Sequence, residues 1–274
     1  MKILFLGDIM GRVGREAIKH FVPQLKEKHK ADLVIANVEN LAHGKSATEK
    51  TLQEIKEAGV EVFTSGNHVF KKQDVYELLE KEDIVIPANY PEGVSGKRYL
   101  VKEIGAYRLF IANLMGRVFI KEDFTCPFIK MDELLEDAKK EGANIILVDL
   151  HAEASSEKMA FFLEFRKKVG AILGTHTHVA SQDFAVYDGC AFVSDVGMVG
   201  GFPSVIGVNE ENVIKEFRNQ TPQKFEMADT KWAEFNAVLI DFDGTSGRAK
   251  KIEKIREFID IENGKNSKKT PKIE

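Results

Sequence analysis

Short apolar runs alternate with amphipathic segments along the first third of the chain. Residues 3–6 form a continuous apolar run, which is typical of a strand covered on both faces, and the largely apolar residues 33–38 and 60–63 are the next expected strands. Between the runs, apolar residues recur at helical spacing, as they do between residues 18 and 25. This order of strand and helix predicts a sheet of parallel strands joined by right-handed crossovers.

Three local signals predict where the first two helices begin and end. Pro23 lies inside the first amphipathic segment and predicts a kink or an early end of that helix. Ser46 and Glu49 have the spacing of a capping box, which predicts the start of the second helix near residue 46. Gly59 is placed to end that second helix.

The pattern changes in the middle of the chain. Residues 84–86, 99–101 and 107–113 are typical of strands, but no long helix separates them. This part of the chain is therefore expected to add an antiparallel or mixed element. Further on, the dipeptide Asp188-Gly189 between two apolar runs predicts a hairpin.

The C-terminal third is expected to contain a glycine-rich loop, a strand pair and a tail. Residues 195–201 are rich in glycine and predict the loop, and residues 235–242 and 249–255 predict the paired strands. Residues 263–274 are polar and lysine-rich without an apolar period, which predicts a frayed tail. Since there is no repeat or linker, residues 1–262 are expected to form a single domain.

Composition narrows the class of protein. With 274 residues, 43% of them hydrophobic and 30% charged, the chain is typical of a globular protein with a sizeable core. A formal net charge of −4 offers no general surface for nucleic acid or an anionic membrane. Cys126 and Cys190 lie far apart and predict buried free thiols. There is no signal-peptide core and no membrane-length apolar run, so a cytoplasmic location is expected; a homo-oligomer is compatible with the sequence.

Side chains with metal-ligand chemistry follow five of the apolar runs. The most informative case is the pair His176 and His178, separated by one residue, which follows the run at residues 171–173 after Gly174 and Thr175. Because the carboxyl ends of parallel strands meet at one edge of a sheet, side chains that follow such strands are expected to line one pocket. In chain order, these candidates are Asp8, Glu39, Asn67, His151, His176 and His178.

This set of side chains predicts a site for two metal ions. Mixed carboxylate, amide and imidazole ligands suit first-row ions such as iron, manganese or zinc better than magnesium or calcium. The set is larger than one catalytic ion needs, since an open site usually keeps three protein ligands. Glu39 is the natural bridge, because a carboxylate offers two oxygens to two neighbouring cations. The sequence therefore predicts a metal-dependent hydrolase.

Taken singly, most of these residues have an ordinary structural explanation. Asp8 could cap a helix, Glu39 could be a solvated charge, and Asn67 could be a turn residue. His151 could be a hydrogen-bonded core histidine. The closely spaced histidine pair is harder to explain in this way, because two residues with a period of two face the same direction. The joint occurrence of all these residues is what favours a metal site.

Several short motifs carry a resemblance to a known family over about residues 1–257. They are Gly7-Asp8-Ile9-Met10-Gly11, Asn37-Val38-Glu39-Asn40, Gly66-Asn67-His68, Pro87-Ala88-Asn89-Tyr90-Pro91-Glu92-Gly93, Asp149-Leu150-His151-Ala152-Glu153-Ala154, Gly174-Thr175-His176-Thr177-His178 and Asp195-Val196-Gly197-Met198. Their order resembles the signature of the calcineurin-like metallophosphoesterases. The closer resemblance is to the bacterial YmdB-like branch, whose members act on 2′,3′-cyclic nucleotides.

Two positions depart from the general superfamily pattern. Met10 stands where the first motif usually has a histidine, and Glu39 stands where the bridging residue is usually an aspartate. Both departures are typical of the YmdB-like branch. In that branch the asparagine after the glutamate resembles a residue that acts as a substitute metal ligand. Here that residue is Asn40.

The resemblance implies a fold and a division of the ligands. The fold is a four-layer α/β/β/α sandwich, with two mixed β-sheets flanked by helices. One metal ion would be held by Asp8, Glu39, Asn40 and His178, and the other by Glu39, Asn67, His151 and His176. Iron is the preferred metal, with manganese or zinc as alternatives.

The expected reaction is hydrolysis of a small-molecule nucleotide phosphodiester. A hydroxide bridging the two ions would attack a 2′,3′-cyclic nucleotide and give a 3′-nucleotide. His68 is expected to act as the general acid, although it could instead support Asn67. No substrate-binding residue is assigned.

Two other functional classes remain open. One is a metal-binding regulatory protein with little turnover, which would act through a partner. The other is an amidohydrolase-type metallohydrolase. Those enzymes usually carry their His-x-His motif at the first strand of a barrel, whereas the motif here begins at His176.

Overall fold

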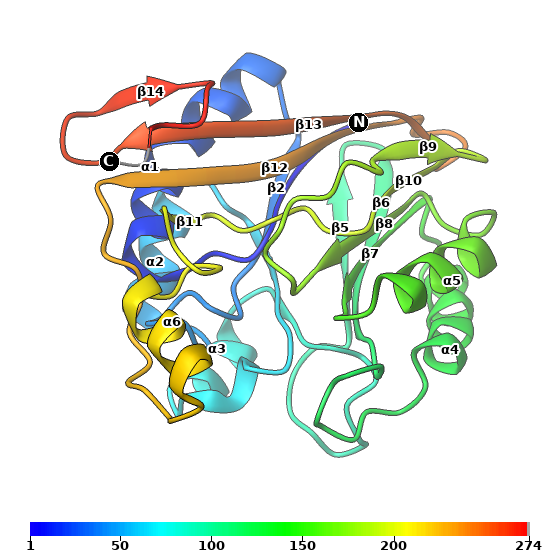
Figure 1. Ribbon diagram of the computed structural model, residues 1–274. Helices are drawn as coiled ribbons and strands as arrows, with labels where there is room; N and C mark the ends of the chain where they lie inside the picture. The colour runs from blue at the N-terminus through cyan, green and yellow to red at the C-terminus, as the bar shows by residue number, and fades with distance from the viewer. Residues whose placement is uncertain (273–274) are drawn as a thin grey trace.

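Two β-sheets pack face to face, and helices cover the outer face of each sheet (Figure 1). The structure is a computed structural model and describes residues 1–272. One apolar cluster lies between the first sheet and its helices, a second between the two sheets, and a third between the second sheet and its helices. The predicted four-layer α/β/β/α sandwich with two mixed sheets is confirmed.

The first sheet combines a parallel half with an antiparallel half. Strands β1 to β4 pair in parallel, as the alternation of strand and helix predicts, while β12 pairs antiparallel with β1. The order is β14-β13-β12-β1-β2-β3-β4, with β11 also paired to β12. The bounds are β1 Lys2–Leu6, β2 Leu33–Asn37, β3 Val62–Thr64, β4 Ile84–Val85, β11 Gly200–Phe202, β12 Trp232–Phe242, β13 Ala249–Asp260 and β14 Lys265–Ser267.

The second sheet is also mixed, with the order β5-β6-β7-β8-β10-β9. Strands β6, β7, β8 and β10 are parallel, while β5 and β9 pair antiparallel at the two edges. This confirms the mixed element that the middle of the sequence predicts, and the hairpin at Asp188-Gly189 joins β9 to β10. The bounds are β5 Tyr99–Ile104, β6 Tyr107–Met115, β7 Ile145–His151, β8 Ala171–Thr175, β9 Ala185–Tyr187 and β10 Cys190–Val193.

The helices bury one apolar face each against the sheets, except α6. Helices α1 (Gly11–His29), α2 (Glu49–Glu57) and α3 (Val75–Lys81) contribute to the cluster on the first sheet. Helices α4 (Pro127–Lys140) and α5 (Ser155–Phe165) do the same on the second sheet. A short 3-10 helix spans Val69–Lys71, and α6 (Glu210–Asn219) has no buried residue. No helix in the described range of residues is long and apolar enough to cross a membrane.

Two helix boundaries differ from the sequence prediction. Helix α1 does not end early at Pro23 but continues to His29. Pro23 is exposed, so the carbonyl that loses its N–H partner can be hydrated instead. The prediction of a cap at Ser46 is also wrong, because Thr48 is the N-cap of α2 and exchanges capping-box hydrogen bonds with Thr51.

Two strands lie where the sequence predicts irregular chain. Strand β11 forms within the glycine-rich segment and pairs with β12, which corrects the last part of the predicted loop at residues 195–201. Strand β14 pairs with β13, so the prediction of a frayed tail from residue 263 is wrong for Lys265–Ser267. Residues 273 and 274 of the predicted tail lie outside the described residues.

Candidate metal centre

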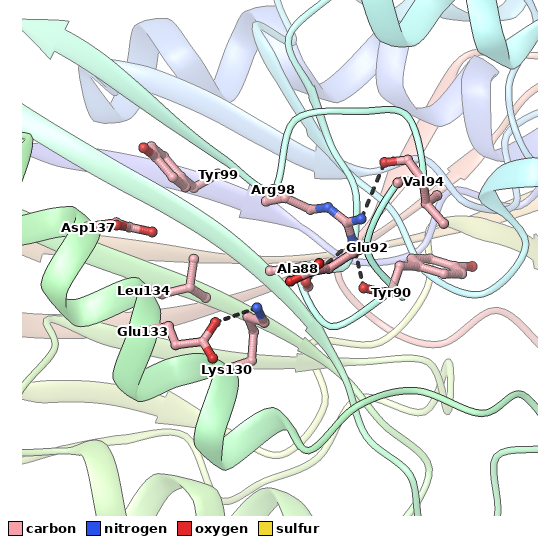
Figure 2. A pocket seen from close by; sticks show the side chains of 11 residues that line it. Ala88, Tyr90, Glu92, Val94, Arg98, Tyr99, Lys130, Glu133, Leu134 and Asp137 are labelled. Atoms are coloured by element: carbon pink, nitrogen blue, oxygen red, sulfur yellow. Dashed lines mark hydrogen bonds and ion pairs between the residues drawn. The ribbon is translucent and has the colours of Figure 1, made fainter.

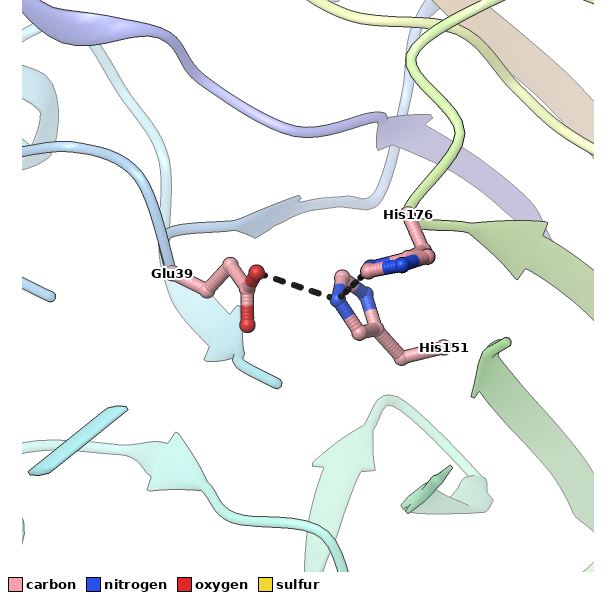
Figure 3. A group of neighbouring side chains, drawn as sticks. All are labelled: Glu39, His151 and His176. Carbon is pink, nitrogen blue, oxygen red and sulfur yellow. Dashed lines mark hydrogen bonds and ion pairs between the residues drawn. The ribbon is translucent and has the colours of Figure 1, made fainter. Parts of the chain in front are cut away.

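The candidate centre lies where the carboxyl ends of strands from both sheets meet. Figure 3 shows its middle, where Glu39 comes from the first sheet and His151 and His176 come from the second. Glu39 Oε1 lies 3.1 Å from His151 Nε2, and His176 Nδ1 lies 3.0 Å from the same nitrogen. The ligand atoms of all three residues lie within 4.8 Å of one another, which is close enough to share one cation.

A second group of candidates lies beside the first. His178 Nε2 is 3.2 Å from Asn40 Nδ2 and 3.7 Å from Asp8 Oδ1. The other oxygen of Asp8, Oδ2, accepts a hydrogen bond from the backbone N–H of His176 at 3.1 Å. Asp8 and Asn40 follow strands of the first sheet, whereas both histidines follow β8 of the second. The centre therefore joins the two sheets.

Asn67 and His68 complete the set on the side of strand β3. The backbone N–H of His68 donates to Glu39 Oε2 at 3.2 Å, and His68 Nδ1 lies 3.0 Å from Asn40 Oδ1. The Asn67 amide nitrogen donates to Glu122 Oε1 at 3.3 Å. Contacts thus join seven of the predicted residues, Asp8, Glu39, Asn40, His68, His151, His176 and His178, and Asn67 adjoins them in the chain with its amide bonded to Glu122.

Three features of this cluster fit a metal site. Asp8 Oδ1 and Asn67 Oδ1 are buried without a hydrogen-bond partner among residues 1–272, although buried oxygens usually have one. Both belong to candidate ligands. In addition, a Cβ atom at Gly66 would lie 1.9 Å from Glu39 Oε2 and 2.5 Å from His151 Nε2, so only glycine leaves this space open. The donor set and the unpartnered oxygens are those that a cation would satisfy.

The charges of the cluster depend strongly on one another. Burial raises the pKa of Asp8, but the nearby His178, the charge of His151 and the backbone N–H of His176 outweigh this and hold it below its usual range. The pKa of Glu39 is likewise held low, because His151 and His68 outweigh its burial. Burial lowers the pKa of His151, yet Glu39 and Asp8 raise it to about 9. His176 has its pKa lowered to about 3 by burial and by the neighbouring His151. If a cation bound here and displaced the protons of the histidines, it would contact the two buried carboxylates of Asp8 and Glu39.

Sequence reasoning misses the residues that orient His151. Thr175 Oγ1 lies 2.8 Å from His151 Nδ1 and itself donates to Asp149 Oδ1 at 2.6 Å. Asp149 is fully buried and also accepts from Thr64 Oγ1 and from Asn37 Nδ2. The signal was available in the sequence, because Asp149 precedes His151 by two residues on one strand and must face the same side.

The loop that carries His176 and His178 has its own support. Asp195 Oδ2 accepts from the backbone N–H and the hydroxyl of Thr177, at 3.0 and 2.8 Å. The same oxygen lies 3.0 Å from the Nζ of Lys158, which is 1% exposed and also donates to the Thr175 carbonyl. This buried ion pair is not predictable from the helical pattern that contains Lys158.

A different cavity of about 340 Å³ lies on the outer side of the second sheet, beside α4 (Figure 2). The guanidinium of Arg98 donates to backbone carbonyls of the surrounding loop, so it holds that loop together. Lys130 pairs with Glu133, and the wall also contains the carboxylates of Glu92 and Asp137. With its cations already paired and its carboxylates in excess, this cavity does not suit an anionic substrate.

Comparison with known proteins gives consistent results. The family model of the YmdB-like protein matches residues 4–255. The chain is 38% identical over 257 residues to the 2′,3′-cyclic-nucleotide 2′-phosphodiesterase of Bacillus subtilis strain 168, and the match covers 93% of this chain and 96% of that protein. Among solved structures, it is similar to a novel phosphatase of Mycoplasma pneumoniae, with 40% identity, a TM-score of 0.88 and coverage of 93% and 92%. A hypothetical protein of Thermus thermophilus matches with 38% identity, a TM-score of 0.88 and coverage of 93% and 98%.

Proposed function

This chain belongs to the YmdB-like protein family and is a phosphoric ester hydrolase, and we propose that it hydrolyses 2′,3′-cyclic nucleotides at a centre of two metal ions. The observation that carries the proposal is the cluster at the strand ends, in which two buried ligand oxygens lack a partner among residues 1–272. The substrate follows from the Bacillus subtilis relative, whose name specifies cleavage on the 2′ side. The product would therefore be a 3′-nucleotide.

The ligands of the two ions are proposed from the grouping of contacts. His178 lies next to Asp8 and Asn40, and His151 lies next to Glu39 and His176, with Asp8 Oδ1 also 3.8 Å from His151 Nδ1. One ion would thus be held by Asp8, Glu39, Asn40 and His178, and the other by Glu39, Asn67, His151 and His176. Iron is the preferred metal, with manganese or zinc as alternatives, because the donors are mixed oxygen and imidazole nitrogen.

The contacts of His68 support its proposed role as the general acid. When bound, two metal ions supply a water nucleophile of lowered pKa and neutralise charge that develops on the phosphate. Nδ1 of His68 is held by Asn40 Oδ1 and lies 3.3 Å from Glu39 Oε1. Its Nε2 has no partner within residues 1–272, so this nitrogen is the one that can donate a proton to the leaving O2′. Burial lowers the pKa of His68, and the negative charge of a bound phosphodiester would raise it again.

The test separates metal binding from proton transfer. His178→Ala is expected to lose bound metal and turnover, since it removes a ligand next to the buried Asp8. His68→Ala is expected to keep the metal content of the wild type and to lose kcat by roughly 10²–10⁴-fold, the usual contribution of a general acid. Elemental analysis and hydrolysis of 2′,3′-cyclic AMP measure the two effects.

The control is His20→Ala, which removes a histidine of α1 whose ring contacts Gln24 and Phe21, outside the cluster, and should change neither quantity. If His178→Ala retains its metal and full activity, the ligand assignment is wrong. If the metal-loaded wild type hydrolyses other phosphoesters but not 2′,3′-cyclic nucleotides, the proposed substrate is wrong.

A further inference from the structure

A cavity of about 320 Å³ adjoins the candidate centre and shares His178 with it. Ligand pockets in proteins usually measure roughly 300–1,000 Å³, so this one can hold part of a ligand. The imidazole of His178 reaches the centre through Nε2, near Asp8 and Asn40, and its Nδ1 hydrogen-bonds to the Ile206 carbonyl at 2.9 Å. The cavity therefore begins directly beside a candidate ligand.

Two basic side chains of strand β13 line this cavity. Lys254 pairs with Val238 and Arg256 pairs with Asn236 in the antiparallel ladder, so both face the same side of the sheet. Val238 belongs to the apolar cluster between the two sheets, which shows that this side is the inner one. Lys254 and Arg256 thus lie on the inner side of the first sheet, where the Arg256 side chain is 45% exposed.

Both cations keep hydrogen-bond donors for a ligand. The Lys254 ammonium donates to the carbonyls of Ala180 and Ser181, at 3.4 and 3.1 Å, which leaves one of its three N–H donors. Arg256 donates through Nε to Glu234 at 2.7 Å and lies over the ring of Phe258. Its two terminal amino groups have no partner in the part of the chain that the structure describes.

The charge of the cavity favours an anion. Lys254 and Arg256 face the single carboxylate of Glu234 among its lining residues. Burial and the neighbouring charge of Arg256 lower the pKa of Lys254, and the negative charge of an anion in the cavity would raise it again. A 2′,3′-cyclic mononucleotide with a free 5′-hydroxyl has one anionic group, and the metal centre takes it. The two cations are therefore matched to a second phosphate.

We propose that this cavity binds the phosphate on the 5′ side of the nucleotide whose cyclic phosphate is hydrolysed. Lys254 and Arg256 contact that phosphate, and the guanidinium can do so with two donors. The phosphate can be a 5′-terminal group or the internucleotide phosphate of an RNA 3′ end. In the second case, Phe202, which lines the cavity, offers an aromatic surface to the preceding base. This inference rests on the proposed function for the identity of the reacting group.

Binding tests the cavity without turnover. Calorimetry on metal-loaded protein compares adenosine 3′,5′-bisphosphate with adenosine 3′-monophosphate. The wild type is expected to bind the bisphosphate at least about tenfold more tightly, because charge-assisted hydrogen bonds contribute on that scale. Lys254→Ala and Arg256→Gln should each lose most of this gain and bind the monophosphate as the wild type does.

The two variants guard against a structural artefact. Lys254 also holds the loop of Ala180 and Ser181, which follows His178, so the metal content of Lys254→Ala is measured as a check that the centre is intact. Arg256 donates to Glu234 instead of to that loop. The matched control is Lys28→Ala, which removes a lysine from a different surface pocket near the C-terminal end of α1. Equal binding of both ligands by the wild type, or an undiminished gain in both variants, would overturn the proposal.

Turnover identifies the source of the phosphate. The substrates are 2′,3′-cyclic AMP, its 5′-phosphorylated form and a diadenosine nucleotide that ends in a 2′,3′-cyclic phosphate. A lower KM for both phosphate-bearing substrates supports recognition of the phosphate alone, and a lower KM for the dinucleotide only supports an RNA end. If neither phosphate-bearing substrate has a lower KM than 2′,3′-cyclic AMP, the proposal is contradicted. If the wild type cleaves none of the three but retains the binding gain, the cavity assignment stands and the proposed reaction falls.

Discussion

The orientation of one histidine depends on a threonine that is not itself a candidate ligand. Because the Thr175 hydroxyl donates its hydrogen to Asp149, its oxygen can only accept from His151 Nδ1. His151 therefore carries a proton on Nδ1, and a cation that displaces the proton on Nε2 would meet a lone pair there. That nitrogen is the atom beside Glu39 and His176, so the hydrogen bond prepares His151 to bind a metal ion.

Replacing the threonine hydroxyl should weaken metal binding without changing the shape of the side chain. Thr175→Val keeps the branched volume but leaves His151 Nδ1–H and Asp149 without their partner. Loss of such a supporting hydrogen bond typically costs roughly 10–100-fold in metal affinity. A competition titration with a chromophoric chelator measures the affinity.

Thr175→Ser is the matched control, since serine restores the hydroxyl. It should recover most of the affinity. If the valine variant binds metal as tightly as the wild type, Thr175 contributes only to packing.

At the scale of elements, the turn after β8 combines strain with a strong anchor. His176 and His178 have φ angles of 98° and 66°, in a region that costs non-glycine residues free energy. Asp195 opposes that strain by accepting two hydrogen bonds from Thr177, the residue between them. The buried Lys158 on α5 neutralises Asp195 and ties the turn to the helix layer. The ion pair thus fixes two histidines that are proposed to bind different metal ions.

Breaking this ion pair should destabilise the protein and loosen the centre. Lys158→Met leaves the Asp195 charge buried, and removing one partner of a buried pair typically costs about 3–5 kcal/mol in the free energy of unfolding. Urea denaturation measures that loss, and the metal titration should show weaker binding as well.

The control for this experiment is Lys81→Met, which removes an exposed i,i+4 partner of Glu77 and should change stability little. If Lys158→Met unfolds at the same urea concentration as the wild type, the pair does not anchor the turn.

The helices and strands also show which parts of the fold can be predicted from the sequence and which cannot. Alternation of apolar runs and amphipathic segments predicts the parallel strands well, because those strands are buried on both faces. Short polar segments are different: β14 forms because β13 offers a free edge, and no local property of Lys265–Ser267 reveals this. Thr48 caps α2 although Ser46 has the expected spacing, since Ser46 instead donates to the Val69 carbonyl.

At the scale of the whole molecule, the packing of the two sheets brings together candidate ligands that the sequence identifies only one at a time. Strand ends identify the candidate ligands, because a ligand-type side chain after a buried strand is a local pattern. The pairing of Asp8 with His178 and of Glu39 with His151 is a long-range result of sheet packing. Lys254 lies in a strand with alternating charge and could not be assigned from sequence, because its role depends on which face meets the second sheet.

Because the centre lies between the two sheets, metal binding should stabilise the whole fold. Without a cation, Asp8 and Glu39 are buried beside each other and rely on histidines as counter-charges.

A metal present at about 100 times its Kd adds about 2.7 kcal/mol to the free energy of unfolding. For a chain of this size, each kcal/mol raises Tm by roughly 2–4 °C, so loss of one ion should lower Tm by about 5–10 °C and loss of both by roughly twice that. Differential scanning calorimetry of holoprotein and of protein dialysed against a chelator measures the shift. Acid should reduce the shift, because protons compete with the metal for His151 and His178, whose pKa values the neighbouring carboxylates raise despite burial. His178→Ala should show a smaller shift than the wild type at every pH. An unchanged Tm after complete removal of the metal would mean that the ions do not link the two sheets.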